Sequence, residues 1–255
     1  MSEVARIAAL VLVLWVGLSG LSSCKDGSGP SGGKRQPAQI EKKEPRKGPW
    51  PYLEETEKRK LARNLLAKNF VVVFDGSGSM AETECAEGRT KSEVSKEAVL
   101  EWSEGVPQGA QVGLISFHKS GWTEIPLQRY DRNTFLKAIQ AIRPGGTTPL
   151  AAAMHKADQM LLREARKQLG YGEYSIVVVT DGIADDPRTL LETVRSILAR
   201  TPVVIHTIGF CIGERHSLNQ PGRTYYRTAN DPAALRKGLQ DVLAEADTFD
   251  PTDFR

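Results

Sequence analysis

A chain of 255 residues, of which 40% are hydrophobic and 25% are charged, has the composition of one globular domain with additional segments. Its net charge of +3 is uneven, because residues 25–50 hold seven Lys and Arg against three Asp and Glu, which leaves residues 51–255 at about −1. This near-neutral part has no basic stripe with interleaved aromatic residues, so nucleic-acid binding is not expected.

An N-terminal export signal is predicted over residues 1–23. After Arg6, an apolar run of 15 residues is too short for a membrane-spanning helix and is typical of a signal peptide. The sequence LSSC at 21–24 resembles the lipobox of bacterial lipoproteins, which implies that Cys24 is lipidated and becomes the N-terminus. The resemblance places the domain in the bacterial cell envelope, in the periplasm or at the cell surface, and Lys25 favours the outer membrane. A secretory signal with an incidental cysteine is the alternative.

The segments between this signal and the first apolar strand are polar. Residues 24–50 are rich in Gly, Pro, Ser and Lys, so they cannot bury enough surface to offset their ordering entropy and form a predicted flexible, basic linker. Residues 51–68 are predicted to form a charged amphipathic helix with sparse apolar positions. A short tail is expected at 247–255. The apolar positions of the predicted helix are Leu53, Leu61, Leu65 and Leu66.

From residue 69 to 246, short apolar runs alternate with helical patterns. Strands that are apolar on every residue and are separated by helices indicate an α/β fold, with a doubly wound, mostly parallel central sheet flanked by helices. The two segments at 111–117 and 122–127 should form an antiparallel hairpin. Strands are predicted at 70–75, 111–117, 122–127, 174–181, 202–210 and 223–228, and helices at 91–104, 132–142, 150–167, 187–200 and 232–245.

Oxygen-bearing side chains follow the predicted strands at the points where they end. The run FVVVFD ends in Asp75, and Ser77 and Ser79 follow at alternate positions between glycines. A second carboxylate, Asp181, ends the strand that contains IVVVT. Because parallel strands bring their carboxyl ends to one edge of the sheet, where such folds bind ligands, we expect these side chains to lie close together.

A third oxygen source is the turn RPGGTTPL at 143–150, in which Thr147 and Thr148 precede a helix. Hard cations such as Mg²⁺ bind about six oxygen atoms and retain water molecules. Two carboxylates and a few hydroxyls fit that requirement, and their two negative charges balance a divalent ion. Such a neutral site gains by taking a further carboxylate from outside into an open position.

These residues resemble the von Willebrand factor A (VWA) domain over about residues 69–246, and DGSGSM at 75–80 is similar to its metal-ion-dependent adhesion site (MIDAS), with the signature Asp-x-Ser-x-Ser. The resemblance implies a bound Mg²⁺ or Mn²⁺ whose shell is completed by a Glu or Asp of a partner protein. It favours Thr148 over Thr147 as a ligand, because Met154 follows at the usual spacing. The implied metal ligands are Asp75, Ser77, Ser79, Thr148 and Asp181, the last usually acting through water.

The sequence therefore predicts a metal-dependent protein-binding module on a membrane, and no enzyme. An envelope scaffold or assembly factor with a structural metal site is the alternative. The hydrolase motif G-x-S-x-G is absent, and phosphotransferases of the haloacid dehalogenase type, a remote alternative, need an acid where Ser77 stands. The hydroxyls and Asp181 could also serve only as helix caps and turn residues. Asp185 and Asp186, before Pro187, are interpreted as capping residues.

Two cysteines remain after Cys24. An exported chain meets an oxidising compartment, and both residues should lie at the carboxyl edge of the sheet, so a Cys85–Cys211 disulfide is predicted beside the site. A metal site made by these thiols with His118 or His216 lacks regular ligand spacing.

Two long segments return to the same edge of the sheet, the loop 81–90 and the segment 211–231. As a hypothesis, together they form the rim that selects the partner. A plain surface loop before the last strand is the alternative for 211–231.

Overall fold

The computed structural model describes residues 49–53 and 60–246. The predicted signal peptide, Cys24, nearly all of the predicted linker and the tail lie outside the described residues. None of the helices within the described ranges is long and apolar enough to cross a membrane.

One mixed sheet forms the centre of the described part of the chain. Its strands are β1 (Lys68–Gly76), β2 (Gln111–His118), β3 (Gly121–Arg129), β4 (Glu173–Thr180), β5 (Val204–Phe210) and β6 (Tyr225–Ala229). They are arranged in the order β3-β2-β1-β4-β5-β6. All neighbouring strands are parallel except β2 and β3, which form the predicted antiparallel hairpin.

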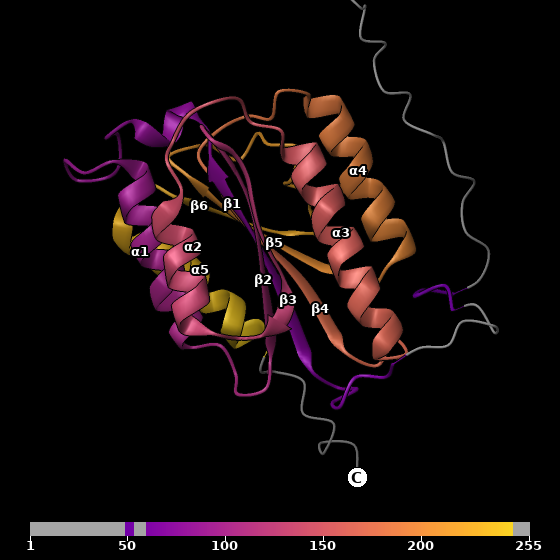
Figure 1. Ribbon diagram of the computed structural model, residues 1–255. Coiled ribbons are helices and arrows are strands. Elements are labelled where there is room, and N and C mark those ends of the chain that lie inside the picture. The colour runs from indigo at the N-terminus through magenta and orange to yellow at the C-terminus, as the bar shows by residue number, and fades with distance from the viewer. Residues whose placement is uncertain (1–48, 54–59, 247–255) are drawn as a thin grey trace, which may run out of the picture. The chain divides into compact units, whose positions relative to one another are not determined.

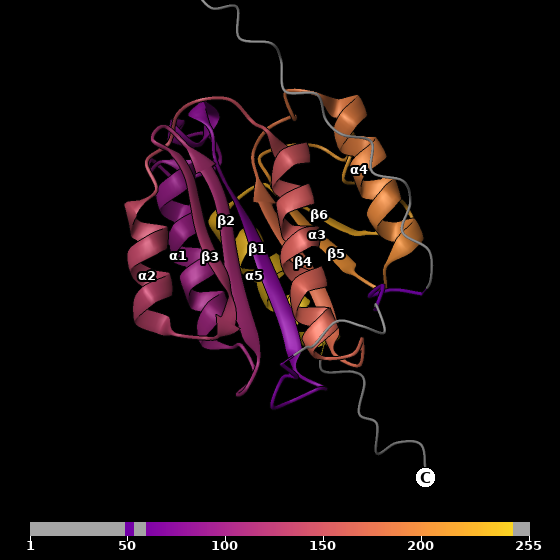
Figure 2. The same ribbon diagram turned by 45° about the vertical axis from the view of Figure 1, so that its right-hand side comes forward.

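Helices cover both faces of this sheet. In the ranges described they are η1 (Gly78–Ala81), α1 (Lys91–Glu104), α2 (Arg132–Ala141), α3 (Leu150–Lys167), α4 (Pro187–Arg200) and α5 (Pro232–Ala246). Figure 1 shows α1, α2 and α5 on one side of the sheet and α3 and α4 on the other, and Figure 2 shows the same layers after a turn. The predicted doubly wound, mostly parallel α/β fold is confirmed.

The central strand β1 shows how both faces of the sheet are buried. Phe70, Val72 and Phe74 belong to the core under α1, α2 and α5, whereas Val71 and Val73 belong to the core under α3 and α4. A strand buried on both faces needs a continuous apolar run, which is why its sequence does not alternate. Burial on both sides fixes the register of β1 and therefore the position of its carboxyl end.

The predicted helix over 51–68 is wrong for the residues that the structure describes. Residues 60–67 form a bend, a turn and chain without regular secondary structure, and β1 begins at Lys68. Leu61 and Leu66 are 51% and 65% exposed, so they provide no buried face to stabilise a helix of charged residues.

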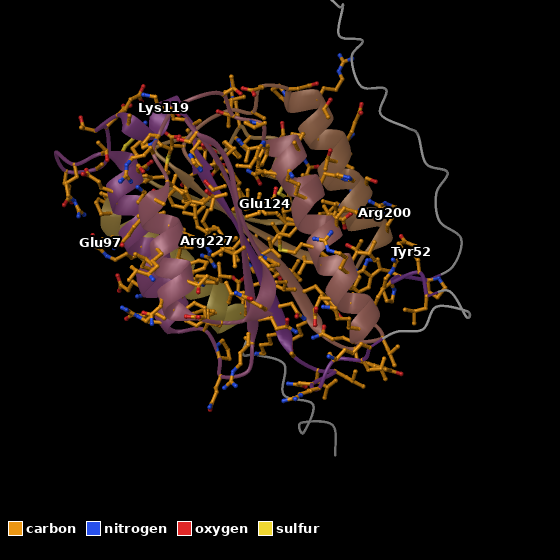
Figure 3. The ribbon with its side chains drawn as sticks, in the orientation of Figure 1. Tyr52, Glu97, Lys119, Glu124, Arg200 and Arg227 are labelled. Carbon is orange, nitrogen blue, oxygen red and sulfur yellow. A yellow bond between two sulfur atoms is a disulfide. The ribbon has the colours of Figure 1, made fainter. Side chains whose placement is uncertain are left out.

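The segment 49–53 instead packs on the domain near the ends of two helices. The side chain of Arg166 in α3 donates from Nε to the carbonyl oxygen of Pro51 at 3.2 Å. The hydroxyl of Tyr52 donates to the carbonyl oxygen of Arg200, the last residue of α4, at 3.4 Å, and Figure 3 shows these two residues side by side. The chain therefore joins the domain beside the C-terminal ends of α3 and α4.

Candidate functional site

Two aspartates reach the same edge of the sheet from neighbouring strands. Asp75 lies near the end of β1, and Asp181 follows Thr180, the last residue of β4. The strands β1 and β4 are parallel, and the strand order reverses between them. Doubly wound sheets bind their ligands at this point. Both aspartates are buried, with 0% and 4% of their surface exposed.

The carboxylate of Asp75 is held at both of its oxygen atoms. Its Oδ1 accepts a hydrogen bond from the backbone N–H of Ser77 at 2.8 Å, and its Oδ2 accepts one from the hydroxyl of Thr180 at 2.6 Å. Burial raises the pKa of Asp75 to about 6, against the opposing effect of these hydrogen bonds. A buried carboxylate that has only neutral donors would be stabilised in its charged form by a nearby cation.

The serine hydroxyls connect this strand end to Asp181. The Oγ atoms of Ser77 and Ser79 lie 3.2 Å apart, and Ser79 Oγ donates to Asp181 Oδ1 at 2.8 Å. Burial raises the pKa of Asp181, although hydrogen bonds from Ser79 and from Lys91 act in the opposite direction. The loops after β1 and β4 are thus joined through their side chains.

The turn before α3 is fastened to the loop after β1 by backbone hydrogen bonds. Gly145 donates to the carbonyl oxygen of Gly76 at 2.9 Å, and Gly78 donates to that of Gly146 at 3.1 Å. Gly145 and Gly146 have φ angles of 149° and 86°. Side chains are strongly disfavoured in this region, so the two glycines allow the close approach.

The two threonines of this turn differ in their surroundings. Thr147 is exposed, whereas Thr148 is 8% exposed and donates its backbone N–H to Asp185 Oδ1 at 2.8 Å. A Cβ atom built on Gly182 would lie 3.5 Å from Ser79 Oγ and 3.8 Å from Thr148 Oγ1. The hydroxyls of two loops therefore border the same small space beside the third loop.

Helix capping explains Asp186 but not the other candidate residues. Asp186 accepts hydrogen bonds from the first turn of α4, as predicted. The capping role predicted for Asp185 is wrong, because its carboxylate accepts a hydrogen bond from the backbone N–H of Thr148. Ser77 precedes η1 without a side-chain cap, and the N-cap position of α3 is Pro149. The hydroxyls of Ser77 and Thr148 are therefore not committed to helix ends.

Lys91, the first residue of α1, is a component of the site that the sequence reasoning missed. Its side chain is 4% exposed, and its Nζ lies 3.1 Å from Asp181 Oδ2 and 2.9 Å from Glu82 Oε2. Burial lowers the pKa of Lys91, but hydrogen bonds to Glu82 and Asp181 outweigh that effect and leave the pKa raised. A lysine in the first turn of a helix is disfavoured by the helix dipole. This mismatch was the feature of the sequence that could have drawn attention to Lys91.

The structure joins Cys85 and Cys211 in a disulfide, with Cα atoms 5.8 Å apart. This is the pairing predicted from the sequence, and it links the loop 81–90 to the residue that follows β5. Because both thiols are used in the bridge, they are not available as metal ligands together with His118 or His216.

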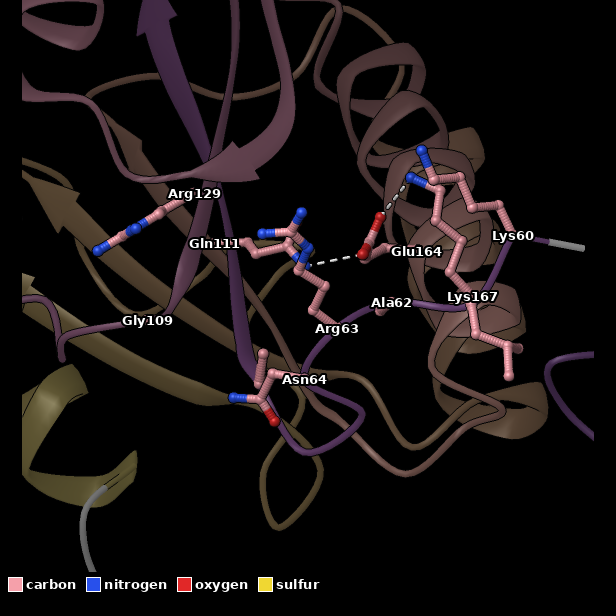
Figure 4. A pocket seen from close by; sticks show the side chains of 11 residues that line it. Lys60, Ala62, Arg63, Asn64, Gly109, Gln111, Arg129, Glu164 and Lys167 are labelled. Atoms are coloured by element: carbon pink, nitrogen blue, oxygen red, sulfur yellow. Dashed lines mark hydrogen bonds and ion pairs between the residues drawn. The ribbon is translucent and has the colours of Figure 1, made fainter.

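A hollow of ≈ 600 Å³ lies at the opposite edge of the sheet, at the start of β1 and β2. Figure 4 shows Glu164 there, which accepts hydrogen bonds from Gln111 and Lys167, each at 2.7 Å. Beyond these, its charged lining residues in the described ranges are the cations Lys60, Arg63 and Arg129. The described part of this wall offers no set of oxygen ligands, and the hollow is remote from the two aspartates.

The chemistry of the donor set at the aspartates fits a hard divalent cation. Within the described ranges, no three His, Cys, Asp or Glu side chains cluster in a way that could hold a metal. A metal here would rest on two carboxylates and the hydroxyls of Ser and Thr, which are the ligands that Mg²⁺ and Mn²⁺ prefer. Burial raises the pKa of both Asp75 and Asp181. A cation would stabilise the charged forms of the two carboxylates, which burial disfavours.

Comparison with known proteins identifies the domain. The protein-family model for the von Willebrand factor type A domain matches residues 69–244 of this chain. The Bacillus subtilis (strain 168) protein YwmC, described as uncharacterized, is 25% identical over 156 residues, and the match covers 56% of this chain and 66% of YwmC. The chain thus matches slightly less than two thirds of the length of this relative.

Solved structures show the same fold. A von Willebrand factor type A protein from Catenulispora acidiphila has a TM-score of 0.56 and 20% identity, covering 71% of this chain and 43% of that one. Proximal thread matrix protein 1 from the mussel byssus, in a form with a zinc-occupied MIDAS motif, has a TM-score of 0.55 and 20% identity, covering 71% and 48%.

The family match agrees with the architecture described above. It spans well over half of the chain. It begins in β1, the central strand, and ends in α5, the last helix. Domains of this family are metal-dependent protein-interaction modules and in general not enzymes. The chain belongs to the von Willebrand factor type A domain family.

Proposed function

We propose that the protein is a metal-ion-dependent binding module, tethered to a bacterial membrane, that captures a Glu or Asp of a partner protein through a bound divalent cation, Mg²⁺ or Mn²⁺. The observation that carries the proposal is the fastening of three loops to one another around one small group of oxygen atoms. Side-chain hydrogen bonds join the loops after β1 and β4, and backbone bonds join both of them to the turn before α3. The residues that would hold the cation are Asp75, Ser77, Ser79, Thr148 and Asp181.

The loops are fastened by protein groups alone, so the oxygen atoms are positioned before any ligand binds. The hydroxyl of Thr148 makes no hydrogen bond to any described residue, although the residue is 8% exposed. Preformed sites bind more tightly because little entropy is lost on ordering them. An uncommitted hydroxyl beside two carboxylates suits a cation ligand.

The charges of the site determine what it attracts. The buried charged groups are the carboxylates of Asp75 and Asp181 and the ammonium of Lys91. Together they carry one net negative charge, and a bound divalent cation would change it to one net positive charge. The neutral site expected from the sequence did not include Lys91. When bound, the cation supplies an open coordination position, and the positive excess favours an external carboxylate. The side chain of Glu82 is 59% exposed, so solvent screens its contribution.

Metal titration tests the proposal at its centre. We expect isothermal titration of the EDTA-stripped protein with Mg²⁺, Mn²⁺ and Zn²⁺ to give saturable binding. Loss of one oxygen ligand in Thr148→Ala should weaken binding about tenfold or more. The matched variant Thr147→Ala should bind as the wild type, because that side chain is exposed. Absence of binding in the wild type, or equal affinities in the two variants, would contradict the proposal.

The membrane tether rests on the sequence at residues 21–24, which lie outside the described residues. Their resemblance to a lipobox supports lipidation of Cys24 and a place in the cell envelope, with the outer membrane favoured. Mass spectrometry of the protein extracted from membranes should find an acylated Cys24 as the first residue. A chain that retains Met1, or an unmodified Cys24, would remove the tether from the proposal.

A further inference from the structure

A hollow of ≈ 560 Å³ adjoins the candidate metal site. One of its lining residues stands two positions after Asp181, and another is hydrogen-bonded to the backbone oxygen of Gly182 at 3.1 Å. The hollow and the loop that carries Asp181 therefore share a wall. The lining residues are Ile183, Ile212, Gly213, Glu214, Arg215 and His216.

The lining favours an apolar occupant. Ile183 is 67% exposed, a large apolar surface for a residue two positions after the buried Asp181. Ile212 is half-buried in the same hollow, and Gly213 adds no side chain that would fill it. Glu214 and Arg215 are both exposed, and their opposite charges give the rim no net preference for a charged group. Covering Ile183 and Ile212 with an apolar group removes their surface from water, which is favourable.

The wall of the hollow is held in place from several sides. Ile212 follows Cys211, whose disulfide to Cys85 ties it to the loop 81–90. The hydroxyl of Tyr226 donates to the carbonyl oxygen of Gly213 at 2.9 Å. A wall fixed in this way loses little entropy when a ligand binds, so the hollow is suited to recognition.

The ring of His216 fixes the distance between the hollow and the metal loop. Its Nδ1 accepts a hydrogen bond from the backbone N–H of Leu218 at 3.1 Å, so Nε2 carries the proton and donates to the carbonyl oxygen of Gly182. The ring also stacks on Tyr226, with centroids 5.9 Å apart. This geometry makes the position of the hollow relative to Asp181 a property of the folded protein.

We propose that the hollow takes a large apolar side chain of the partner, such as Leu, Ile, Phe or Met, that stands one or two residues from the carboxylate bound at the metal site. This spacing follows from the separation of the two sites on the protein. Ile183 stands only two positions after Asp181, and an extended peptide advances about 3.3 to 3.6 Å per residue, so one or two residues of the partner span a comparable distance. This inference rests on the proposed function and specifies its partner. It names an acidic residue with a close apolar neighbour as the recognition element.

Selection of random linear peptides displayed on phage tests the inference. The immobilised protein is loaded with Mg²⁺, and bound phage are released with EDTA so that metal-dependent binders are recovered. We expect the recovered peptides to share an Asp or Glu with a large apolar residue one or two positions away. In synthetic peptides, replacing this apolar residue by Ser should weaken binding about tenfold.

Two protein variants test whether the preference for an apolar residue arises at the hollow. In Ile183→Ser, which changes an exposed side chain, the advantage of the apolar residue should disappear while the acidic residue and Mg²⁺ remain required. Leu66→Ser is the matched control, because Leu66 is 65% exposed and lies at the opposite edge of the sheet. It should select the same peptides as the wild type.

The outcomes separate the two proposals. Acidic peptides that need Mg²⁺ but show no apolar preference, or an unchanged preference in Ile183→Ser, would overturn this inference and leave the proposed function standing. If no acidic peptide is released by EDTA, the proposed function fails, and the inference fails with it.

Discussion

Replacing Lys91 by Met should reveal how strongly the buried site depends on one positive charge. The ammonium of Lys91 lies 3.1 Å from Asp181 Oδ2, and both side chains are almost fully buried. At that distance and an effective dielectric constant near 20, the attraction is about 5 kcal/mol before desolvation is counted. Removing one partner of a buried pair leaves an uncompensated charge and typically costs about 3 to 5 kcal/mol. Because Asp181 keeps the hydrogen bond from Ser79, we expect the lower end, roughly 3 kcal/mol.

Urea unfolding at pH 7 in EDTA measures this loss without any metal. Lys91→Met should lower the free energy of unfolding, and the double variant with Asp181→Asn should recover most of it, because no charge is then left unpaired. Glu82→Gln is the control for the other contact of Lys91. Its side chain is 59% exposed, so its loss should change the stability by less than about 1 kcal/mol.

Two results would refute this reasoning about Lys91. A loss below about 1 kcal/mol in Lys91→Met would mean that water reaches Asp181 and replaces the ammonium. Additive effects of Lys91→Met and Asp181→Asn would mean that the two residues do not interact in solution.

Two further predictions test the burial of single residues. His206 faces Glu245 and is 5% exposed, and burial lowers its pKa from 6.5 to about 4. The unfolded chain therefore binds a proton first, and up to about 3 kcal/mol of stability is lost as the pH falls between these values. Urea titrations should show a smaller loss in His206→Gln, and parallel curves would contradict this. Gly76→Ala should lose more than about 2 kcal/mol, since its Cβ would lie 2.6 Å from the carbonyl oxygen of Phe117, whereas the Cβ of Gly78→Ala would meet one backbone oxygen at 3.5 Å. Equal stabilities of the two glycine variants would refute the clash.

The elements that could be predicted closely are those whose signals are local. The helix predicted at 187–200 has the same bounds in the structure, because Asp186 caps it and Pro187 occupies its first turn. The central strands were recognisable because burial on both faces requires continuous apolar runs. From the position of these strands it followed that Asp75 and Asp181 would meet at one edge of the sheet.

The residues that escaped prediction depend on packing between distant segments. Nothing local distinguishes Asp185 from Asp186, yet one binds the backbone of Thr148 and the other caps α4. The contact of Lys91 with Asp181 forms because the loop after β4 lies beside the start of α1. The segment 51–68 has a helical composition, but its Leu53, Leu61 and Leu66 are 40%, 51% and 65% exposed. Sequence periodicity describes one element at a time and carries no information on such contacts.

The candidate metal site and the attachment of the N-terminal segment lie at opposite ends of α3. Its first residue, Leu150, follows the turn with Thr148, and Arg166 near its last turn binds the carbonyl oxygen of Pro51. Its 18 residues span about 27 Å between the candidate metal site and the point where the N-terminal segment joins the domain. A lipid at Cys24, if present, would therefore be connected through the linker to the end of α3 remote from the candidate site. The length of the linker would then set how far the site can reach from the membrane.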